Sequence, residues 1–271
     1  MSRKLAIPAV LVLCVFALVA TPPAMAITGG EPDRVHTNVG LVRFTTADGR
    51  FRCSGTLISQ TVVLTAGHCT EGPATNVYVS FDFQLQPDPL QPGITPAEKA
   101  AREAHYITGT AHPDPGWTGK LSTAKQHDQG VVVLSAPAES KWPGITPATL
   151  APIGFLDGNQ GALKNETFTL VGYGVDIGPE NKTQIVVQER RSTTSYLKNV
   201  QREVVIFQIN DRDSKAGGGS CFGDSGGAVF SGGYLLGDSS FVNSFACNAT
   251  AGYQRVDTTY ARRFLDGFLN P

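Results

Sequence analysis

Short apolar runs rich in β-branched residues recur along most of the chain, and residues typical of turns separate them. They are Val39–Phe44, Gly55–Ser59, Thr61–Thr65, Val77–Phe83, Gly130–Leu134, Phe168–Val171, Gln184–Gln188, Glu203–Ile209, Ala228–Phe230 and Tyr234–Gly237. Short runs at this spacing, bounded by Gly, Pro, Ser and Thr, are typical of strands in an antiparallel barrel or sandwich. The pattern therefore predicts an all-β fold.

Helical patterns are few. Pro96–Ala104 combines good helix formers with a proline at the first position, and Asp257–Leu269 has an N-cap candidate followed by apolar residues at helical spacing. Gln84–Gly116 carries six prolines and is expected to be a long surface excursion, and the Gly-rich Ser214–Ser220 is expected to be a loop. Prolines recur over 137–152, so a boundary between two β-rich halves is expected there.

The first 26 residues have the layout of a signal peptide. Arg3 and Lys4 precede an apolar run over 5–20, which ends in the cleavage pattern Ala24-Met25-Ala26. The alternative is a membrane anchor, but the run is short for a bilayer span and contains Pro8. We expect removal of 1–26, secretion, and no membrane association of the mature chain.

Charge and cysteine content narrow the function classes. The net charge is −1, and loss of Arg3 and Lys4 makes it about −3, so no basic patch suggests a nucleic-acid partner. Four cysteines remain after the signal: Cys53, Cys69, Cys221 and Cys247. An even number in an exported chain favours two disulfides, with three connectivities possible. None of the four shows the C-x-x-C spacing of a zinc site, and no metal or other cofactor is expected.

Ser225 is the candidate nucleophile, in the run Cys221-Phe222-Gly223-Asp224-Ser225-Gly226-Gly227. A serine hydroxyl needs a base to take its proton and donors that stabilise the oxyanion of the intermediate. Glycines let the backbone turn tightly and expose N–H groups. The N–H groups of Gly223 and Ser225 are therefore candidate oxyanion donors.

His68 and Asp128 are the candidate partners of Ser225. His68 follows an apolar run and precedes Cys69, whose disulfide would fix the backbone beside the ring. Asp128 stands at the mouth of the apolar run 130–134, where a carboxylate can orient an imidazole. Asp114 is the rival for this role.

The order of these residues separates two classes of hydrolase. The run around Ser225 also fits the G-x-S-x-G pattern of α/β-hydrolases, whose histidine follows the serine in the chain. Here the last histidine is His127, before Ser225, which excludes that order. The order His68, Asp128, Ser225 is that of chymotrypsin-like enzymes.

The sequence resembles the chymotrypsin/trypsin family of secreted serine proteases. The segments that carry the resemblance are TAGHC around His68, CFGDSGG around Ser225, ITGG from Ile27, HDQGVVVL around Asp128 and VGYG at 171–174. The resemblance implies two packed antiparallel six-stranded Greek-key β-barrels, 27–145 with the His and Asp and 146–271 with the Ser, and a C-terminal helix. It also implies the disulfides Cys53–Cys69 and Cys221–Cys247.

The resemblance assigns two further sets of residues. Asp224 would pair with the free ammonium of Ile27 once the signal has been removed, with no separate pro-segment. The primary substrate pocket would be formed by Gly219, Ser220, Phe222, Ser240, Phe241 and Val242. Gly219 stands where an acid would be needed to bind Arg or Lys, and Val242 narrows the entrance. The family pattern Ser-Trp-Gly reads Ser240-Phe241-Val242 here, and cleavage after apolar residues is expected.

The sequence thus predicts a secreted, monomeric serine endopeptidase. Its partners would be protein or peptide substrates, with proteinaceous inhibitors as further candidates. Two alternatives remain open: a binding protein on the same fold that has lost catalysis, and an esterase, which shares the chemistry. All three triad residues are present, which favours the enzyme.

Overall fold

The computed structural model describes residues 27–72, 75–121, 126–177, 183–210 and 216–269. The predicted signal peptide lies outside the described residues. Within them, no helix combines the length and the apolar character that a membrane span requires.

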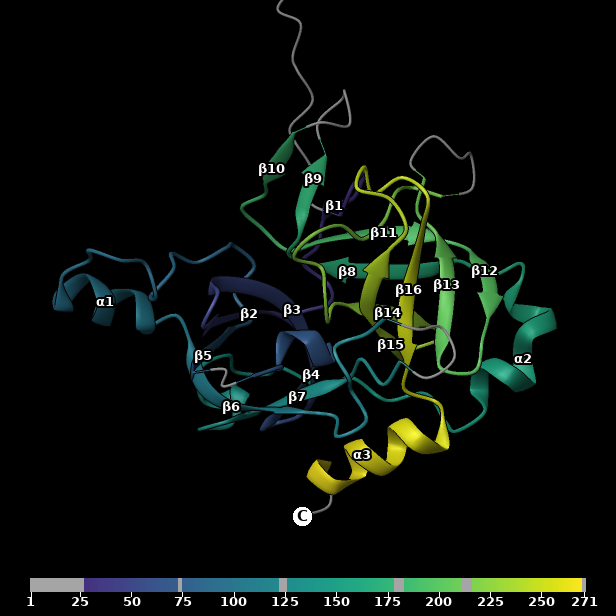
Figure 1. Cartoon of the computed structure of the whole chain (residues 1–271), viewed down its shortest axis with the longest axis horizontal. Coiled ribbons are helices and arrows are strands. Elements are labelled where there is room, and N and C mark those ends of the chain that lie inside the picture. Colours follow the sequence, from purple (N-terminus) through teal and green to yellow (C-terminus); the bar gives the residue numbers. More distant parts are fainter. Residues whose placement is uncertain (1–26, 73–74, 122–125, 178–182, 211–215, 270–271) are drawn as a thin grey trace, which may run out of the picture.

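The first half of the chain forms a closed antiparallel barrel. Its strands are β2 (Val39–Thr46), β3 (Gly49–Ser59), β4 (Val62–Thr65), β5 (Thr75–Ser80), β6 (Ile107–Pro113) and β7 (Gly130–Leu134). They are hydrogen-bonded in the order β2-β3-β4-β7-β6-β5 (Figure 1). Val42, Leu57 and Val63 fill the interior because alternate side chains of a strand point to the same face.

The second half forms a sheet with the strands β8 (Phe168–Gly172), β11 (Arg191–Ser195), β12 (Leu197–Val200), β13 (Val204–Gln208), β14 (Ala228–Ser231), β15 (Tyr234–Val242) and β16 (Thr250–Arg255). The order is β11-β8-β14-β15-β16-β13-β12, with the short β1 (Glu31–Pro32) added beside β11. Only Tyr196 separates β11 from β12, and its carbonyl accepts the Gln208 N–H at 3.2 Å. β11 and β12, at opposite ends of this seven-strand order, are therefore the two halves of one bent strand.

The two halves share one topology. With β11 and β12 counted as one bent strand, the second half also has six strands, in the same Greek-key order as the first. The expected pair of six-stranded barrels is confirmed, although nothing in the sequence itself shows this repeat. A separate hairpin, β9 (Val175–Ile177) and β10 (Gln184–Val186), projects from the second half (Figure 1).

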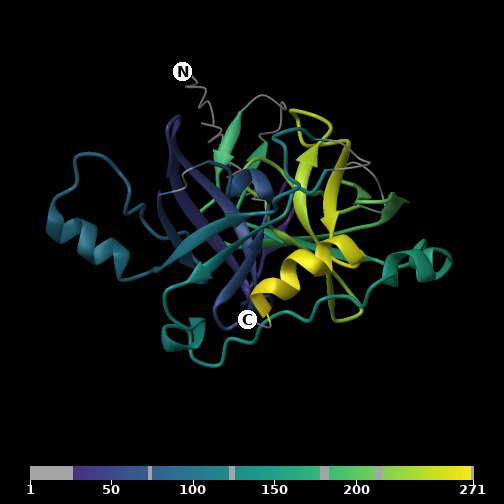
Figure 2. The ribbon, with the colours of Figure 1, turned by 60° about the horizontal axis from the view of Figure 1, so that its bottom comes forward.

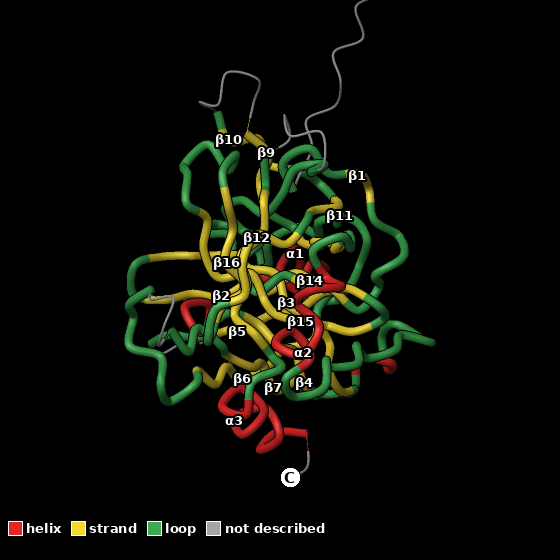
Figure 3. The backbone as a smooth tube through the Cα atoms, turned by 90° about the vertical axis from the view of Figure 1, so that its right-hand side faces the viewer, coloured by secondary structure: helices red, strands yellow, loops and turns green. Residues whose placement is uncertain are grey.

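An apolar cluster joins the halves. Leu64 and Val131 of the first barrel pack with Val171 and Leu235 of the second and with Leu265 of the C-terminal helix α3 (Thr259–Leu269). α3 lies across the region where the halves meet, next to β6 and β7 (Figures 2 and 3). The cluster fixes the first barrel relative to the second, and so fixes the residues between them.

Both predicted helices form. α1 (Pro96–Glu103) begins behind Thr95, which forms a capping box with Glu98. α3 begins two residues later than expected because Asp257, the predicted cap, is bound to Arg255 and to the N–H of Leu156. Thr258 takes the capping role and accepts the Ala261 N–H at 3.1 Å. The Gly-containing helix α2 (Phe155–Leu163) was not predicted.

One expectation is wrong. The excursion over 84–116 ends earlier, because Ile107–Pro113 is β6, a strand of the barrel paired with both β5 and β7. Its sequence, ITGTAHP, buries the Ile107 side chain and lacks an apolar alternation. Gly109 is required there, since a Cβ would lie 2.4 Å from Val132. α1 belongs to the remaining excursion and lies far from the second barrel (Figure 1).

Candidate active site

His68 lies in the 3₁₀ turn Gly67–Cys69 that follows β4. The disulfide Cys53–Cys69 ties this turn to β3. The Gly67 backbone passes so close to the carboxylate of Asp128 that a Cβ would lie 3.1 Å from Oδ1. The imidazole of His68 is about one-third exposed, with 31% of its side-chain surface accessible. One end of the ring is therefore buried against Asp128 while the other is open to a reactant.

Asp128 is fully buried just before β7 and accepts three hydrogen bonds. They come from the His68 backbone N–H (2.8 Å), His68 Nδ1 (2.9 Å) and Ser240 Oγ (2.5 Å). The rival Asp114 is bound elsewhere, to the Tyr260 hydroxyl at 2.8 Å and to the Gly116 N–H at 2.7 Å. Of the two candidates, only Asp128 is hydrogen-bonded to the imidazole of His68.

Ser225 sits in a tight turn between two glycines with positive φ, Gly223 (+93°) and Gly226 (+77°). A Cβ at Gly226 would lie 2.3 Å from the carbonyl oxygen of Ser54, so a larger residue would displace the turn. The Ser225 carbonyl accepts the Ser54 N–H at 2.7 Å, which holds the turn against the first barrel. Within the described chain, the N–H groups of Gly223 and Ser225 have no hydrogen-bond partner, as oxyanion donors require.

His68 and Ser225 line one cavity of about 570 Å³. Its other walls include Phe51 and Glu71. Ser225 comes from the second half of the chain and His68 from the first, so the cavity lies where the two meet. The histidine, its carboxylate partner and the serine are thereby gathered at one place, although they are far apart in sequence.

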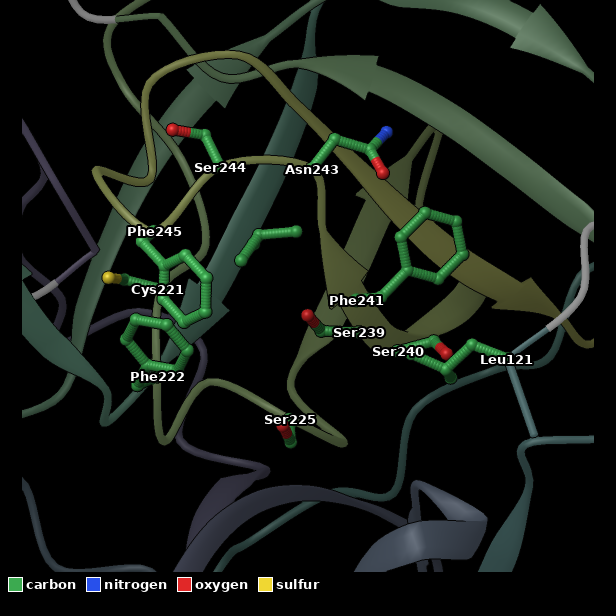
Figure 4. Close-up of a pocket in the computed structure, with 11 residues that line it drawn as sticks. Leu121, Cys221, Phe222, Ser225, Ser239, Ser240, Phe241, Asn243, Ser244 and Phe245 are labelled. Atoms are coloured by element: carbon green, nitrogen blue, oxygen red, sulfur yellow. The ribbon is translucent and has the colours of Figure 1, made fainter. Parts of the chain in front are cut away.

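Ser225 also lines a second pocket, of about 490 Å³ (Figure 4). Four residues predicted for the substrate pocket, Phe222, Ser240, Phe241 and Val242, belong to its lining. Sequence reasoning missed Phe245 and Leu121, which also line it and are 90% and 56% exposed. Large apolar side chains exposed around a pocket are a signal of binding that a sequence alone does not reveal.

Gly219 and Ser220, which were also predicted for the substrate pocket, are not among the residues that line it. The Gly219 N–H donates to the Thr28 carbonyl at 2.9 Å, and a Cβ at this glycine would meet Ile209. The hydroxyl of buried Ser220 is hydrogen-bonded to that of Tyr253. The disulfide Cys221–Cys247 links the segment before Ser225 to the loop that carries Phe245.

Asp224 and Ile27 are both fully buried. Asp224 accepts the N–H groups of Gly174 (2.7 Å) and Cys221 (2.8 Å). Burial raises the pKa of Asp224 to about 7, although these two hydrogen bonds and the Arg52 charge oppose the shift. In the full chain the Ile27 nitrogen is part of the peptide bond to Ala26 and carries no charge. The charge of Arg52 therefore does not offset the cost of burying the ionised carboxyl of Asp224.

A metal is not favoured by the donor atoms here. Among the described residues, Cys53, His68 and Cys69 bring ligand atoms close enough together for an ion. The two sulfurs are bonded to each other, however, and a disulfide sulfur is not the thiolate that metals bind.

The sequence model of the trypsin family matches residues 27–262. The chain belongs to the trypsin family. The chain is also 30% identical over 128 residues to a cercarial protease of Schistosoma mansoni, a match that covers 43% of this chain and 48% of the relative. It thus spans about half the length of that curated relative.

Solved structures of the trypsin fold are similar over nearly the whole chain. HL collagenase aligns with a TM-score of 0.63 at 19% identity, covering 91% of this chain and 97% of that one. A scabies mite inactivated protease paralogue aligns with a TM-score of 0.61 at 17% identity, covering 90% of this chain and 100% of that one. At such identities the likeness shows the fold alone.

Proposed function

We propose that the chain is a secreted serine endopeptidase that hydrolyses peptide bonds through an acyl-enzyme, with His68, Asp128 and Ser225 as its triad. The observation that carries the proposal is the hydrogen bond between His68 Nδ1 and the buried carboxylate of Asp128, beside a cavity that His68 shares with Ser225. A carboxylate on Nδ1 fixes the imidazole tautomer that leaves Nε2 free to accept a proton.

In the proposed mechanism, Ser225 Oγ attacks the scissile carbonyl carbon while His68 Nε2 takes the hydroxyl proton. The N–H groups of Gly223 and Ser225 stabilise the resulting oxyanion. His68 then gives the proton to the leaving amine, the C–N bond breaks, and the acyl group stays on Ser225. A water molecule, deprotonated by His68, hydrolyses this ester and restores the serine.

The second pocket supports cleavage after apolar residues. Its lining includes three phenylalanines, a leucine and a valine, and none of the side chains in it is charged at neutral pH. An Arg or Lys side chain would lose its hydration there without gaining a counter-ion. Phe245, held on a turn closed by the Cys221–Cys247 disulfide, extends the apolar surface over the rim.

We propose that the protease becomes active once the signal peptide is removed, with no further cleavage. Cleavage after Ala26 would free the Ile27 amine, and its ammonium would supply a cation for the buried carboxyl of Asp224. N-terminal sequencing of the secreted protein tests this: a start at Ile27 is expected, and any other start contradicts it.

Cleavage of a mixed peptide library by the secreted protein tests the function. We expect internal cleavage after small to medium apolar residues, and none by the Ser225→Ala variant. Preference for Arg or Lys would refute the specificity. Equal cleavage by wild type and Ser225→Ala would refute the proposed nucleophile.

A further inference from the structure

Asp238 is a second buried carboxyl behind the triad. It lies on β15, two residues before Ser240, and none of its surface is exposed. Neither side-chain oxygen has a hydrogen-bond partner among the residues described, and no ion pair to a Lys, Arg or His of that part of the chain reaches it. Asp128, by contrast, accepts three hydrogen bonds.

Gln254 stands opposite Asp238 in the sheet and is hydrogen-bonded to the backbone of Asp128. It is the cross-strand partner of Asp238 on β16, and directly opposed side chains of an antiparallel pair lie close together. Its Oε1 accepts the backbone N–H of Asp128 at 3.2 Å, while its buried Nε2 has no partner within the described chain. The opposite neighbour of Asp238, on β14, is Ala228, which offers no polar side chain.

The groups facing Asp238 do not favour its ionised form. The titratable neighbours are Asp128, from the segment before β7, and the Tyr253 phenol on β16. The cation nearest in sequence, Arg255, is bound to Asp157 and Asp257. Burial raises the pKa of Asp238 well above its usual range, the Asp128 charge raises it further, and the nearby Gln129 side chain opposes the shift only in part.

Two adjacent buried carboxyls do not both ionise readily, because each charge loses its hydration and repels the other. The carboxyl that accepts more hydrogen bonds is the one that stays ionised, and that carboxyl is Asp128. We propose that Asp238 is a positioning residue: a neutral, proton-bearing carboxyl that holds Gln254 against Asp128, so that within this pair Asp128 alone is charged behind His68. The part of this proposal that concerns catalysis rests on the proposed function.

Unfolding measurements test the protonation state without any need for activity. The unfolding constant is measured between pH 5 and 8 for two proteins, both carrying Ser225→Ala so that neither can digest itself. One keeps Asp238 and the other carries Asp238→Asn. A carboxyl that stays protonated when folded but ionises above about pH 4 when unfolded makes rising pH favour unfolding. The unfolding constant of the Asp238 protein should therefore rise, relative to Asp238→Asn, by about tenfold per pH unit up to the folded pKa.

A second neutral variant and a matched control show whether the pH slope comes from the Asp238 carboxyl. Asp238→Leu should give the same slope as Asp238→Asn, whatever its absolute stability, because the slope comes from the carboxyl that both lack. Asp257 is also buried, but it accepts hydrogen bonds from the Arg255 guanidinium and the Leu156 N–H, and an arginine keeps its charge throughout this range. Asp257→Asn should therefore lower stability by a constant amount over this range. A flat Asp238 comparison would overturn the proposal.

Kinetics test the positioning role. Asp238→Ala should lower kcat/KM about tenfold, because Gln254 loses its neighbour, and Asp238→Asn should restore it at pH 7. The acid limb of the kcat/KM profile should have the same midpoint in Asp238→Asn as in wild type. If Asp238 were charged, its removal would take away a negative charge behind the imidazole and move that midpoint down by about one pH unit. Such a move contradicts the proposal, whereas absent turnover with the predicted unfolding slope contradicts only the proposed function.

Discussion

The two barrels share one strand order but differ in what they bury. Among the described residues, three aspartates are buried before residue 146: Asp33, Asp114 and Asp128. Seven ionisable residues are buried after it: Arg190, Arg191, Glu203, Asp224, Asp238, Arg255 and Asp257. The first barrel thus relies on apolar packing, whereas the second also depends on buried charges and their partners. His68 and Asp128 are therefore held by a barrel packed mainly with apolar side chains. Ser225 is held by a barrel whose structure also depends on buried charges.

This difference predicts which half of the molecule is sensitive to pH and to chain processing. Apolar burial depends little on pH or on chain processing. A buried carboxyl such as Asp224 responds to both, because its charge must be matched by a cation nearby. Changes to the first half should therefore affect stability or the imidazole, while changes to the second should make activity depend on processing and pocket shape.

Replacement of Asp128 has the largest expected effect. Asp128→Asn should lower kcat about 10⁴-fold, because an amide no longer fixes the imidazole tautomer or stabilises its charged form. Asp114→Asn is the matched control, since Asp114 is bound to Tyr260 and should change kcat less than about tenfold. Steady-state kinetics on a peptide substrate measure both. A greater loss in Asp114→Asn would reverse the assignment.

Extension of the mature N-terminus by one residue comes next. An added alanine before Ile27 should prevent the ammonium from reaching Asp224 and lower kcat/KM about 10³-fold, the order expected for a broken buried ion pair. Ile27→Val keeps the free amine and should remain active. Full activity of the extended chain would show that the second barrel does not depend on this cation.

Truncation of one core leucine in each barrel tests the common part of the architecture. Leu57 and Leu170 are both fully buried, so Leu57→Ala and Leu170→Ala should each lower the free energy of unfolding by about 3 kcal/mol. Denaturant unfolding in the Ser225→Ala background measures this. Because the halves share an apolar cluster, we expect one cooperative transition; two separate transitions would contradict that expectation.

The smallest effect concerns the pocket. Val242→Gly should widen the entrance and shift preference toward larger apolar residues by about tenfold, the order of one or two methylene contacts. Val186→Gly, on the β10 strand and outside the pocket lining, is the control and should leave the preference unchanged. Peptide-library cleavage compares the two, and an equal preference in wild type and Val242→Gly would remove Val242 from the specificity determinants.

The sequence predicted the elements whose burial is apolar. Gly130–Leu134 was predicted with its observed bounds because its five residues form a continuous apolar strand. Thr250–Arg255, a central strand of the second barrel, was missed because it buries Gln254 and Arg255, polar residues that look exposed in a sequence. The same physics hides Asp238, whose burial depends on strands far away in the chain.

The candidate site was predictable where local motifs carry it. His68 and Ser225 stand in short runs that contain glycine and cysteine, residue types that form tight turns and disulfides and so can be recognised locally. The structure brings both residues to one cavity. Phe245 and Leu121 stand in no such run. They reach the pocket only because a disulfide and the packing of the two halves place their loops beside Ser225.

The central claim is that the imidazole of His68 activates the hydroxyl of Ser225 across the junction of the two halves. Labelling of the secreted protein with a phosphonylating serine reagent, followed by mass spectrometric mapping, tests it most directly. We predict one phosphonyl group, on residue 225, with the labelling rate lowered at least about 10³-fold in His68→Ala. Absence of label on residue 225, or labelling at the same rate in His68→Ala, would contradict the account.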